Sequence, residues 1–418
     1  MARMLIIADD LSGALDTGVA FSKNNVDTLV MVYAGIPKDM FSSCDAAVLV
    51  VDAQTRHLNA GEAYHRVYGL VKEAKTLGIE YIYKKTDSAL RGNVGIELKA
   101  ALDASGEAHI HFVPAFPKHN RYTVNGIHYI DNVPIADSVF GRDPYTPVRT
   151  SSVLELIAGQ TNTAATLSDD AGTHTGERGI VVYNVKCPQE MEQIASGLDK
   201  AGKLALLAGC GGLASAVFKH LRLPQRAAKK CALLSNGLLV VCGSVNPITL
   251  AQLNKAEACG YARLYLPPQL KLDGAYQPLA DAFFAEWKKA SRASGFVIID
   301  ANDREETEST RNYALKNGIG LSQMRERIPL ALGQITKRIL DEGFSSVLMV
   351  TGGDTALGLI RQLQVNSLAP VCEIAPGAIL SEFVYRDKPF QMITKSGGFG
   401  GEDLLVTLMH DISKGMEL

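Results

Sequence analysis

Three short segments in the first half of the chain combine acidic, basic and hydroxyl-bearing side chains. Each segment follows an apolar run, which ends in two aspartates, in one aspartate or in two lysines. Arginine and lysine can hold a carboxylate, whereas aspartate and asparagine bind hydroxyl groups, and an aspartate beside a reacting hydroxyl can act as a general base. The candidate residues are Asp9, Asp10, Asp52, Thr55, Arg56, Lys84, Lys85, Thr86, Asp87, Ser88, Arg91 and Asn93.

These residues also have structural interpretations. A lone aspartate or serine after a strand is often a helix N-cap, which applies to Asp10 and Ser12. Adjacent carboxylates repel unless a base, a metal or a substrate separates them, so the pair Asp9 and Asp10 favours function. The segment 84–93 could be an exposed salt-bridged loop, but its two lysines, aspartate and arginine favour a binding site.

The second half carries glycine where the first half carries charge. Four segments read as junctions between a strand and a turn or helix: Gly243–Asn246, Gly352–Thr355, Pro376–Gly377 and Lys395–Gly401. Glycine permits close backbone approach, and exposed amides at helix N-termini bind phosphate. A tight turn explains each segment alone about as well, but their accumulation favours a nucleotide site. Asp354 or Glu402 could hold Mg²⁺, directly or through water, although the pattern assigns no metal ligand.

Strand and helix signals alternate around these residues. Apolar runs at 5–8, 47–51 and 81–83 alternate with helical patterns at 13–22, 61–74 and 94–102. Such alternation predicts a parallel sheet covered on both faces, with ligands bound outside the carboxyl ends of its strands. The irregular segment 114–147 is expected to cover a substrate, and 126–135 predicts a hairpin that turns at Asp131-Asn132.

The length of 418 residues predicts two domains. We expect α/β domains at 1–225 and 236–418, joined near the basic segment 223–230, with an active-site cleft between them. The composition, with 47% hydrophobic and 21% charged residues, excludes a disordered chain. The formal net charge of −2 gives no global reason to bind nucleic acid or an anionic membrane.

Several classes of protein lack their sequence signatures here. The seven scattered cysteines contain no C-x-x-C, which predicts buried free thiols in a reducing compartment. With neither a signal peptide nor an apolar run long enough for a membrane span, we expect a cytoplasmic protein. The P-loop, dinucleotide, zinc-protease and nucleophile-elbow motifs are absent, and the nine histidines show no metal pattern.

Taken together, these motifs resemble the four-carbon acid sugar kinase family, nearly from end to end. The first half carries ADDLSGALDTG (8–18), DAQTRHL (52–58), KKTDSALRGNVGIEL (84–98), VPAFPKHNRYTVNGIHYIDNVPI (113–135) and FGRDPYTPV (140–148). The second half carries CGSVNPIT, TGGDTA, APG and KSGGFGGED. Ser12 and Ala89 stand where many relatives have threonine, and Cys210-Gly211-Gly212 replaces a more usual Ser-Ala-Gly.

The resemblance implies ATP-dependent phosphorylation of the terminal hydroxyl of a four-carbon sugar acid: D-threonate, D-erythronate or a 3-oxo-tetronate. It implies an N-terminal domain that binds the acid and a C-terminal domain that binds ATP. The implied substrate contacts are Asp10, Arg56, Lys85, Thr86, Asp87 and Ser88, with Arg91 nearby. The implied ATP contacts are Ser244, Gly352, Gly353, Asp354, Thr355 and Gly398.

On this basis we expect a kinase that closes on its ligands. Lys85, Arg56 and Arg91 would hold the carboxylate and upper hydroxyls, and Asp9 or Asp10 would orient or deprotonate the C4 hydroxyl. Asp9, Asp10 and Arg91 form the expected catalytic set. Amides near Ser244, Gly353 and Gly398 would hold the ATP phosphates with Mg²⁺.

Alternatives remain open at this point. The Asp16-Thr17-Gly18 form favours D-threonate or D-erythronate over a 3-oxo-tetronate. A non-catalytic sugar-acid sensor would share the same residues, whereas a nicotinamide-dependent dehydrogenase would need the missing dinucleotide fingerprint. The sequence does not determine the oligomeric state, and a homodimer is one alternative.

Overall fold

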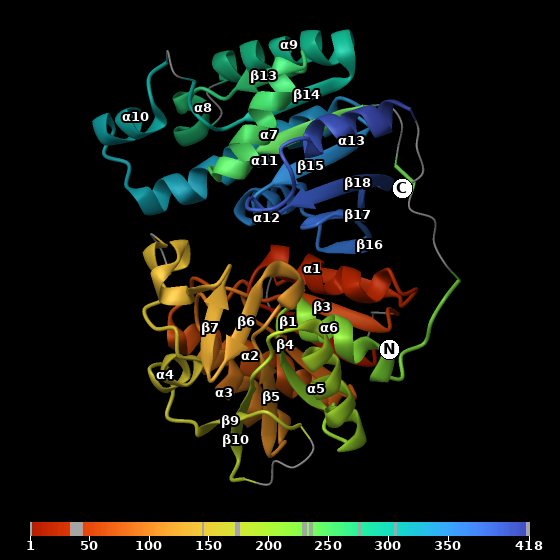
Figure 1. Ribbon diagram of the computed structural model, residues 1–418. Helices are drawn as coiled ribbons and strands as arrows, with labels where there is room; N and C mark the ends of the chain where they lie inside the picture. Colours follow the sequence, from red (N-terminus) through yellow and green to blue (C-terminus); the bar gives the residue numbers. More distant parts are fainter. Residues whose placement is uncertain are drawn as a thin grey trace. The chain divides into compact units, whose positions relative to one another are not determined.

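The computed structural model describes residues 2–33, 45–143, 146–171, 176–227, 232–233, 237–274, 277–304 and 307–414. The chain divides into two compact units, Met1–Ala228 and Lys229–Leu418 (Figure 1). Each unit is an α/β domain, so the predicted fold class is confirmed.

The sheet of the first unit places β1 between β3 and β4. Its strand order is β2-β3-β1-β4-β11-β5-β10-β9, and its pairs are parallel. Ala8 lies opposite both Asp52 and Lys85, so three of the predicted polar strand ends meet at one edge. The strands are β1 (Met4–Ala8), β2 (Thr28–Val32), β3 (Val48–Asp52), β4 (Tyr81–Lys85), β5 (His109–Val113), β9 (Ala165–Ser168), β10 (Gly179–Tyr183) and β11 (Leu206–Gly209).

The helices of this unit form two groups. Contacts join α2 to α3 and α3 to α4, and separately join α1 to α6 and α6 to α5 (Figure 1). Alternate residues of β1, Leu5 and Ile7, share a core with Val67 of α2 and Leu98 of α3. The helices are α1 (Leu11–Ser22), α2 (Ala60–Thr76), α3 (Val94–Ser105), α4 (Val153–Ala158), α5 (Pro188–Lys200) and α6 (Gly211–Val217), with the 3₁₀ turns η1 (Pro117–His119), η2 (Ile135–Asp137), η3 (Val139–Arg142) and η4 (Phe218–His220).

A separate antiparallel sheet interrupts the α/β pattern. It consists of β6 (Arg121–Val124), β7 (Ile127–Ile130) and β8 (Val133–Pro134). The predicted turn at Asp131-Asn132 is confirmed, with positive φ at both residues. The turn between β6 and β7 is Asn125-Gly126, also with positive φ at both positions. This two-residue hairpin turn was not predicted, although Asn-Gly is a strong hairpin signal.

The second unit brings its glycine-rich segments to one sheet edge. Its strand order is β13-β14-β12-β15-β18-β17-β16, parallel through β18 and antiparallel beyond. Thr351 lies opposite both Cys242 and Lys395, the last residues of β12 and β18. The strands are β12 (Leu238–Cys242), β13 (Ala262–Tyr265), β14 (Phe296–Asp300), β15 (Val347–Thr351), β16 (Ser367–Ala375), β17 (Ala378–Tyr385) and β18 (Lys388–Lys395).

Two helices of this unit begin at predicted junctions. The helix α7 begins at Pro247, as predicted, because Asn246 caps it by accepting from the amide of Ile248. The helix α12 follows Gly352, whose φ of 97° suits glycine. The helices are α7 (Pro247–Ala258), α8 (Pro268–Leu272), α9 (Gln277–Ser294), α10 (Thr310–Lys316), α11 (Leu321–Asp341), α12 (Gly353–Leu363) and α13 (Leu404–Ser413).

One expectation from the sequence, that of buried free thiols, needs correction. Cys210 and Cys242 are buried free thiols, but Cys259 is exposed and Cys372 takes part in a disulfide. The predicted linker 223–230 extends into residues 228–230, which lie outside the described residues. The part of the linker before residue 228 packs on the first unit, because Gln225 pairs with Val26.

Among the described residues, no helix combines the length and apolar composition that crossing a membrane would require.

Candidate functional site

Asp9, Asp10 and Arg56 form the centre of the charged site in the first unit. The side chain of Asp10 caps α1, since its Oδ1 accepts from the amide of Gly13 at 2.7 Å. Arg56 Nε donates to Asp9 Oδ2 at 2.7 Å, and its Nη1 donates to Asp10 Oδ2 at 2.5 Å. One guanidinium therefore separates the two carboxylates. The interpretation of Asp10 as a helix cap is confirmed, and its other oxygen faces Arg56.

Asp87 links this centre to a second arginine. Its carboxylate accepts from Arg91 Nε at 2.6 Å and lies 3.7 Å from Arg56 Nη2. Arg91 also contacts Asp143 at 3.3 Å. Burial favours a higher pKa for Asp87, but the arginines, Arg91 first, outweigh it and hold the pKa well below its usual range. The segment 87–91 therefore forms a partly buried network of ion pairs. It is not the exposed loop of the alternative interpretation.

The two adjacent lysines of β4 have different partners. Lys84 is fully buried, and its Nζ binds Glu97 Oε2 at 2.7 Å and the carbonyl oxygens of Ile7 and Lys85. The prediction that Lys84 adds to the substrate-binding patch is therefore wrong, because all three of its donor positions are used inside the fold. Lys85 is also buried, but its Nζ donates to the carbonyl oxygen of Thr86 at 2.7 Å and has no carboxylate partner among the described residues.

Glycine at position 13 leaves space for the groups around it. A methyl group in place of the Gly13 hydrogen would lie 2.8 Å from Asp10 Oδ1 and 3.0 Å from Lys85 Nζ. The Asp10 carboxylate and the Lys85 ammonium therefore lie against the first turn of α1.

The side chain of Asn93 has a structural role. Its Nδ2 donates to the backbone carbonyl oxygens of Thr55 and Leu58, each at 2.9 Å.

Several buried polar atoms near these charges have no partner among the described residues. They include Asp9 Oδ1, Asp52 Oδ2 and Thr86 Oγ1. Burial works to raise the pKa of Asp9, but Arg56, Lys84 and Lys85 outweigh it, so the pKa is lowered. Burial, with Asp10 next in effect, raises the pKa of Asp52 to about 8. Asp9 is thus an ionised acceptor and Asp52 a mostly protonated acid at neutral pH, and unpaired buried atoms of this kind suit a polar ligand.

The hairpin supplies residues that the sequence did not identify. Arg121 of β6 donates a hydrogen bond to Ser88 Oγ. His128 of β7 approaches the carbonyl oxygen of Ser88 through Nε2 at 3.1 Å, and its Nδ1 lies 3.0 Å from Thr123 Oγ1. Burial lowers the pKa of His128 to about 4, so the ring is neutral and its proton lies on Nε2, because a carbonyl only accepts. The interleaved basic and aromatic residues of 112–145 were the available signal.

The glycine-rich segments of the second unit lie against one another. A Cβ at Gly243 would come within 2.2 Å of Thr355 Oγ1, and a Cβ at Gly397 within 2.6 Å of Ser244 Oγ. Gly352 also lies near Ser244, since a Cβ at Gly352 would be 3.8 Å from the backbone nitrogen of Ser244. Asn302 Nδ2 supports this junction by donating to the carbonyl oxygen of Ser244 at 3.1 Å. The structure thus brings together Ser244, Gly352 and Thr355 of the predicted set, with Gly397 beside Ser244.

The remaining predicted residues lie at the open side of this junction. The carboxylate of Asp354 is exposed and contacts Arg325 Nε at 3.0 Å. Gly398 is exposed, and a Cβ there would meet only Asn246 Nδ2, at 3.6 Å. Among the described residues, no group of three or more His, Cys, Asp or Glu side chains could hold a metal ion.

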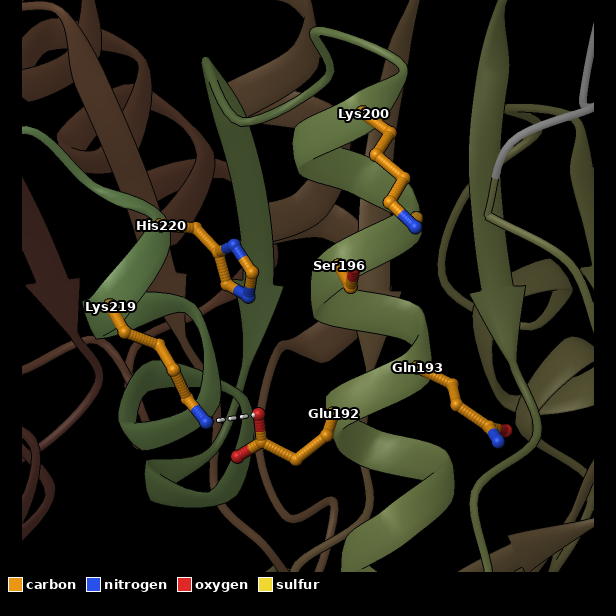
Figure 2. A pocket seen from close by; sticks show the side chains of 7 residues that line it. Glu192, Gln193, Ser196, Lys200, Lys219 and His220 are labelled. Atoms are coloured by element: carbon orange, nitrogen blue, oxygen red, sulfur yellow. Dashed lines mark ion pairs between the residues drawn. The ribbon is translucent and has the colours of Figure 1, made fainter.

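Two surface hollows lie elsewhere. One has a volume of about 430 Å³ and is lined by residues of α5 and η4, and Lys219 pairs there with Glu192 at 2.7 Å. Figure 2 shows these side chains. The other, of about 120 Å³, lies among α8, α9 and α11 and is lined largely by apolar side chains such as Phe283 and Phe284. Neither contains a predicted site residue.

Each unit matches the model of a known family. Residues 4–217 match a family described as a sugar-binding N-terminal domain, and residues 239–405 match a nucleotide-binding C-terminal domain. A D-threonate kinase of Salmonella typhimurium is 28% identical, over 99% of this chain and 99% of its own. The chain belongs to the four-carbon acid sugar kinase family. The present chain is also 26% identical to a D-erythronate kinase of Heliobacterium modesticaldum, over 97% of this chain and 96% of that one.

Solved structures agree with this fold. The kinase superimposes on a Haemophilus influenzae protein with a TM-score of 0.74 and 20% identity, covering 99% of this chain and all of that one. The relatives thus make the chain a carbohydrate kinase of four-carbon acid sugars, and the solved structure supports its two-domain α/β architecture.

Proposed function

We propose that the kinase transfers the γ-phosphoryl group of ATP to the C4 hydroxyl of D-threonate. The observation that carries the proposal is the buried ammonium of Lys85, which has no carboxylate partner among the described residues, in the same site as Asp9 Oδ1 and Thr86 Oγ1. An anionic polyol would supply the missing partners: its carboxylate for the ammonium, and its hydroxyls for the carboxylate and threonine oxygens.

The charged residues would divide the work of binding. Lys85 would hold the substrate carboxylate, with Thr86, Asp87 and Ser88 next to the upper hydroxyls. Arg56 and Arg91 would contact the substrate while also holding Asp9, Asp10 and Asp87 in place, because their guanidinium groups already bind these carboxylates. Arg121 would act through Ser88, to which it donates a hydrogen bond.

Asp9 and Asp10 would orient the attacking C4 hydroxyl. Phosphoryl transfer depends on positioning and on neutralising charge more than on strong base catalysis. The lowered pKa of Asp9 keeps its carboxylate ionised, which suits this orienting role because the carboxylate accepts a hydrogen bond from the hydroxyl. As a weak base, it would receive the proton only late, when the forming bond to phosphorus has made the hydroxyl more acidic. Asp10 would place the hydroxyl relative to the first turn of α1.

The nucleotide would bind the second unit at Ser244, Gly352, Gly353, Asp354, Thr355 and Gly398. Exposed amides in glycine-rich turns bind phosphate groups well. Mg²⁺ commonly uses one or two carboxylates together with phosphate oxygens, and the exposed carboxylates of Asp354 and Glu402 fit that pattern. Bound there, Mg²⁺ would neutralise charge on the phosphates.

The choice of D-threonate rests on the relatives, whereas the Asp16-Thr17-Gly18 segment favours D-threonate or D-erythronate over a 3-oxo-tetronate. The relatives include D-threonate, D-erythronate and 3-oxo-tetronate kinases. ADP release would be measured with each acid at equal concentration, and the phosphorylated carbon would be assigned by ³¹P–¹H correlation. We expect the highest kcat/KM with D-threonate and a 4-phosphate product. A higher kcat/KM with D-erythronate or a 3-oxo-tetronate would reassign the substrate, and turnover with none of them would overturn the proposal.

A further inference from the structure

The segment that follows β18 is held by buried side chains through the carbonyl groups of Ser396, Gly397, Phe399 and Gly401. Thr249 Oγ1 of α7 donates to the carbonyl oxygen of Gly397 at 2.9 Å, and Lys395 Nζ approaches the same oxygen at 3.3 Å. Gln252 Nε2 donates to the carbonyl oxygens of Phe399 at 3.3 Å and Gly401 at 2.8 Å. The carbonyls of residues 397, 399 and 401 therefore face the side chains of α7.

This arrangement determines where the intervening amides point. In a planar trans peptide, the carbonyl of one residue and the N–H of the next point in opposite directions. The N–H groups of Gly398, Gly400 and Glu402 therefore point away from α7. No hydrogen-bond acceptor is found for these three groups among the described residues. Gly400 permits this course with its φ of 86°, and a Cβ there would lie 2.6 Å from Leu404 Cδ2.

The three anchoring side chains are buried. Thr249 and Gln252 have no exposed surface, and Lys395 is 2% exposed. Lys395 Nζ also contacts Thr249 Oγ1 at 3.0 Å, and it has no carboxylate partner among the described residues. Burying an amide and an ammonium costs free energy unless they form hydrogen bonds. Apart from the contact between Lys395 and Thr249, the bonds they form go to one short loop, which indicates that the shape of this loop is what they stabilise.

We propose that Thr249, Gln252 and Lys395 are positioning residues that shape this loop, so that the amides of Gly398, Gly400 and Glu402 form a nest for the nucleotide phosphates. Successive outward N–H groups in such concave turns bind anions. The inference rests on the proposed nucleotide site and adds to it residues that would not touch the nucleotide base.

The test compares ligands with and without phosphate. ADP and adenosine would be titrated calorimetrically into the full chain, in wild type and in Thr249→Val, Gln252→Leu and Lys395→Met. We expect each variant to weaken ADP binding roughly tenfold, the effect of one lost hydrogen bond to a loop that binds charge, and to leave adenosine binding unchanged. In steady-state assays the KM for ATP should rise while the KM for the sugar acid stays constant.

Two further variants separate positioning from general stability. Thr249→Ser keeps the hydroxyl and should bind ADP like wild type. Thr336→Val removes a matched bond, since Thr336 is a fully buried helix threonine whose Oγ1 donates to the carbonyl oxygen of Leu332 at 2.7 Å, and it should not alter ADP binding. Equal weakening of ADP and adenosine, or no weakening in Thr249→Val, would overturn the inference alone. A wild type that binds neither ligand would overturn the nucleotide site itself.

Discussion

The two units use the same kind of sheet edge with different chemistry. At the strand ends of the first unit, charged side chains form a network. Within it, the single side chain of Arg56 contacts three carboxylates, those of Asp9, Asp10 and Asp87. At the strand ends of the second unit, glycine-rich turns lie against one another, and buried side chains such as Gln252 hold their carbonyls. The first site is therefore made of side chains and the second mainly of backbone.

This difference suits the two proposed ligands. A four-carbon acid is small, and only individual side-chain groups placed around it can distinguish its carboxylate from its hydroxyls. A phosphate chain has uniform oxygens, which backbone amides bind without side-chain charge. Changes in the first unit should therefore affect turnover and acid binding, whereas changes in the second should affect nucleotide binding.

The strongest test of this division is Asp10→Asn. Asparagine is also a good N-cap, so the start of α1 should survive while the charge is lost. We expect kcat to fall by roughly 10²–10⁴-fold, the usual contribution of a positioned acid or base. ADP binding, measured by calorimetry, should not change. Unchanged kcat would remove Asp10 from the catalytic set, and Asp9→Asn measured in parallel would show which aspartate matters more.

The next test uses the two adjacent lysines. Lys85→Met should raise the KM for D-threonate roughly 10–100-fold, because a hydrogen bond to a charged group contributes about 1.5–3 kcal/mol. The KM for ATP should stay constant. An unchanged KM for the acid would show that Lys85 does not hold the carboxylate.

Lys84→Met is the matched control for this experiment. It leaves Glu97 buried without its partner, which typically destabilises a protein by about 3–5 kcal/mol. We therefore expect loss of stability in urea unfolding, in contrast to the loss of affinity in Lys85→Met. If both variants changed only acid binding, the assignment of Lys84 to the core would be contradicted.

A smaller effect is expected in the second unit from Gly400→Ala. The positive φ of Gly400 costs other residues about 1–2 kcal/mol, and the added methyl group would press on Leu404. The KM for ATP should rise roughly 5–30-fold, with the KM for D-threonate constant. Gly401→Ala, whose Cβ would meet no atom within 4 Å, should have a weaker effect. An equal effect of the two changes would argue against the specific shape of this loop.

The last test concerns the pH dependence of stability, with no expected effect on the choice of ligand. The pKa of Asp52 is raised from 3.8 to about 8, so between these values the folded chain holds a proton that the unfolded chain has released. Stability should therefore fall as pH rises from about 4 to about 8, by about 1.4 kcal/mol per pH unit from this group. Asp52→Asn should remove that contribution in urea unfolding measured across this range. A variant with the wild-type slope would show that Asp52 ionises normally.

Local signals predicted many parts of both sites. Apolar runs predicted β1, β3 and β4, and the polar residues after them lie at one edge because parallel strands end together. Pro247 and Asn246 predicted the start of α7 for a local reason, since a helix needs a cap. Arg121 and His128 were missed because they come from a hairpin whose packing against Ser88 is not a local property.

The sequence by itself determined the family, the two α/β units and the contrast between a charged half and a glycine-rich half. These features depend on residue type, spacing and hydrophobic period, which are readable along the chain. Only the tertiary structure decided which charges remain available to a ligand. Lys84 and Lys85 are identical neighbours, but successive residues of a strand point to opposite faces, so one meets Glu97 in the core and the other lies against Gly13 at the site.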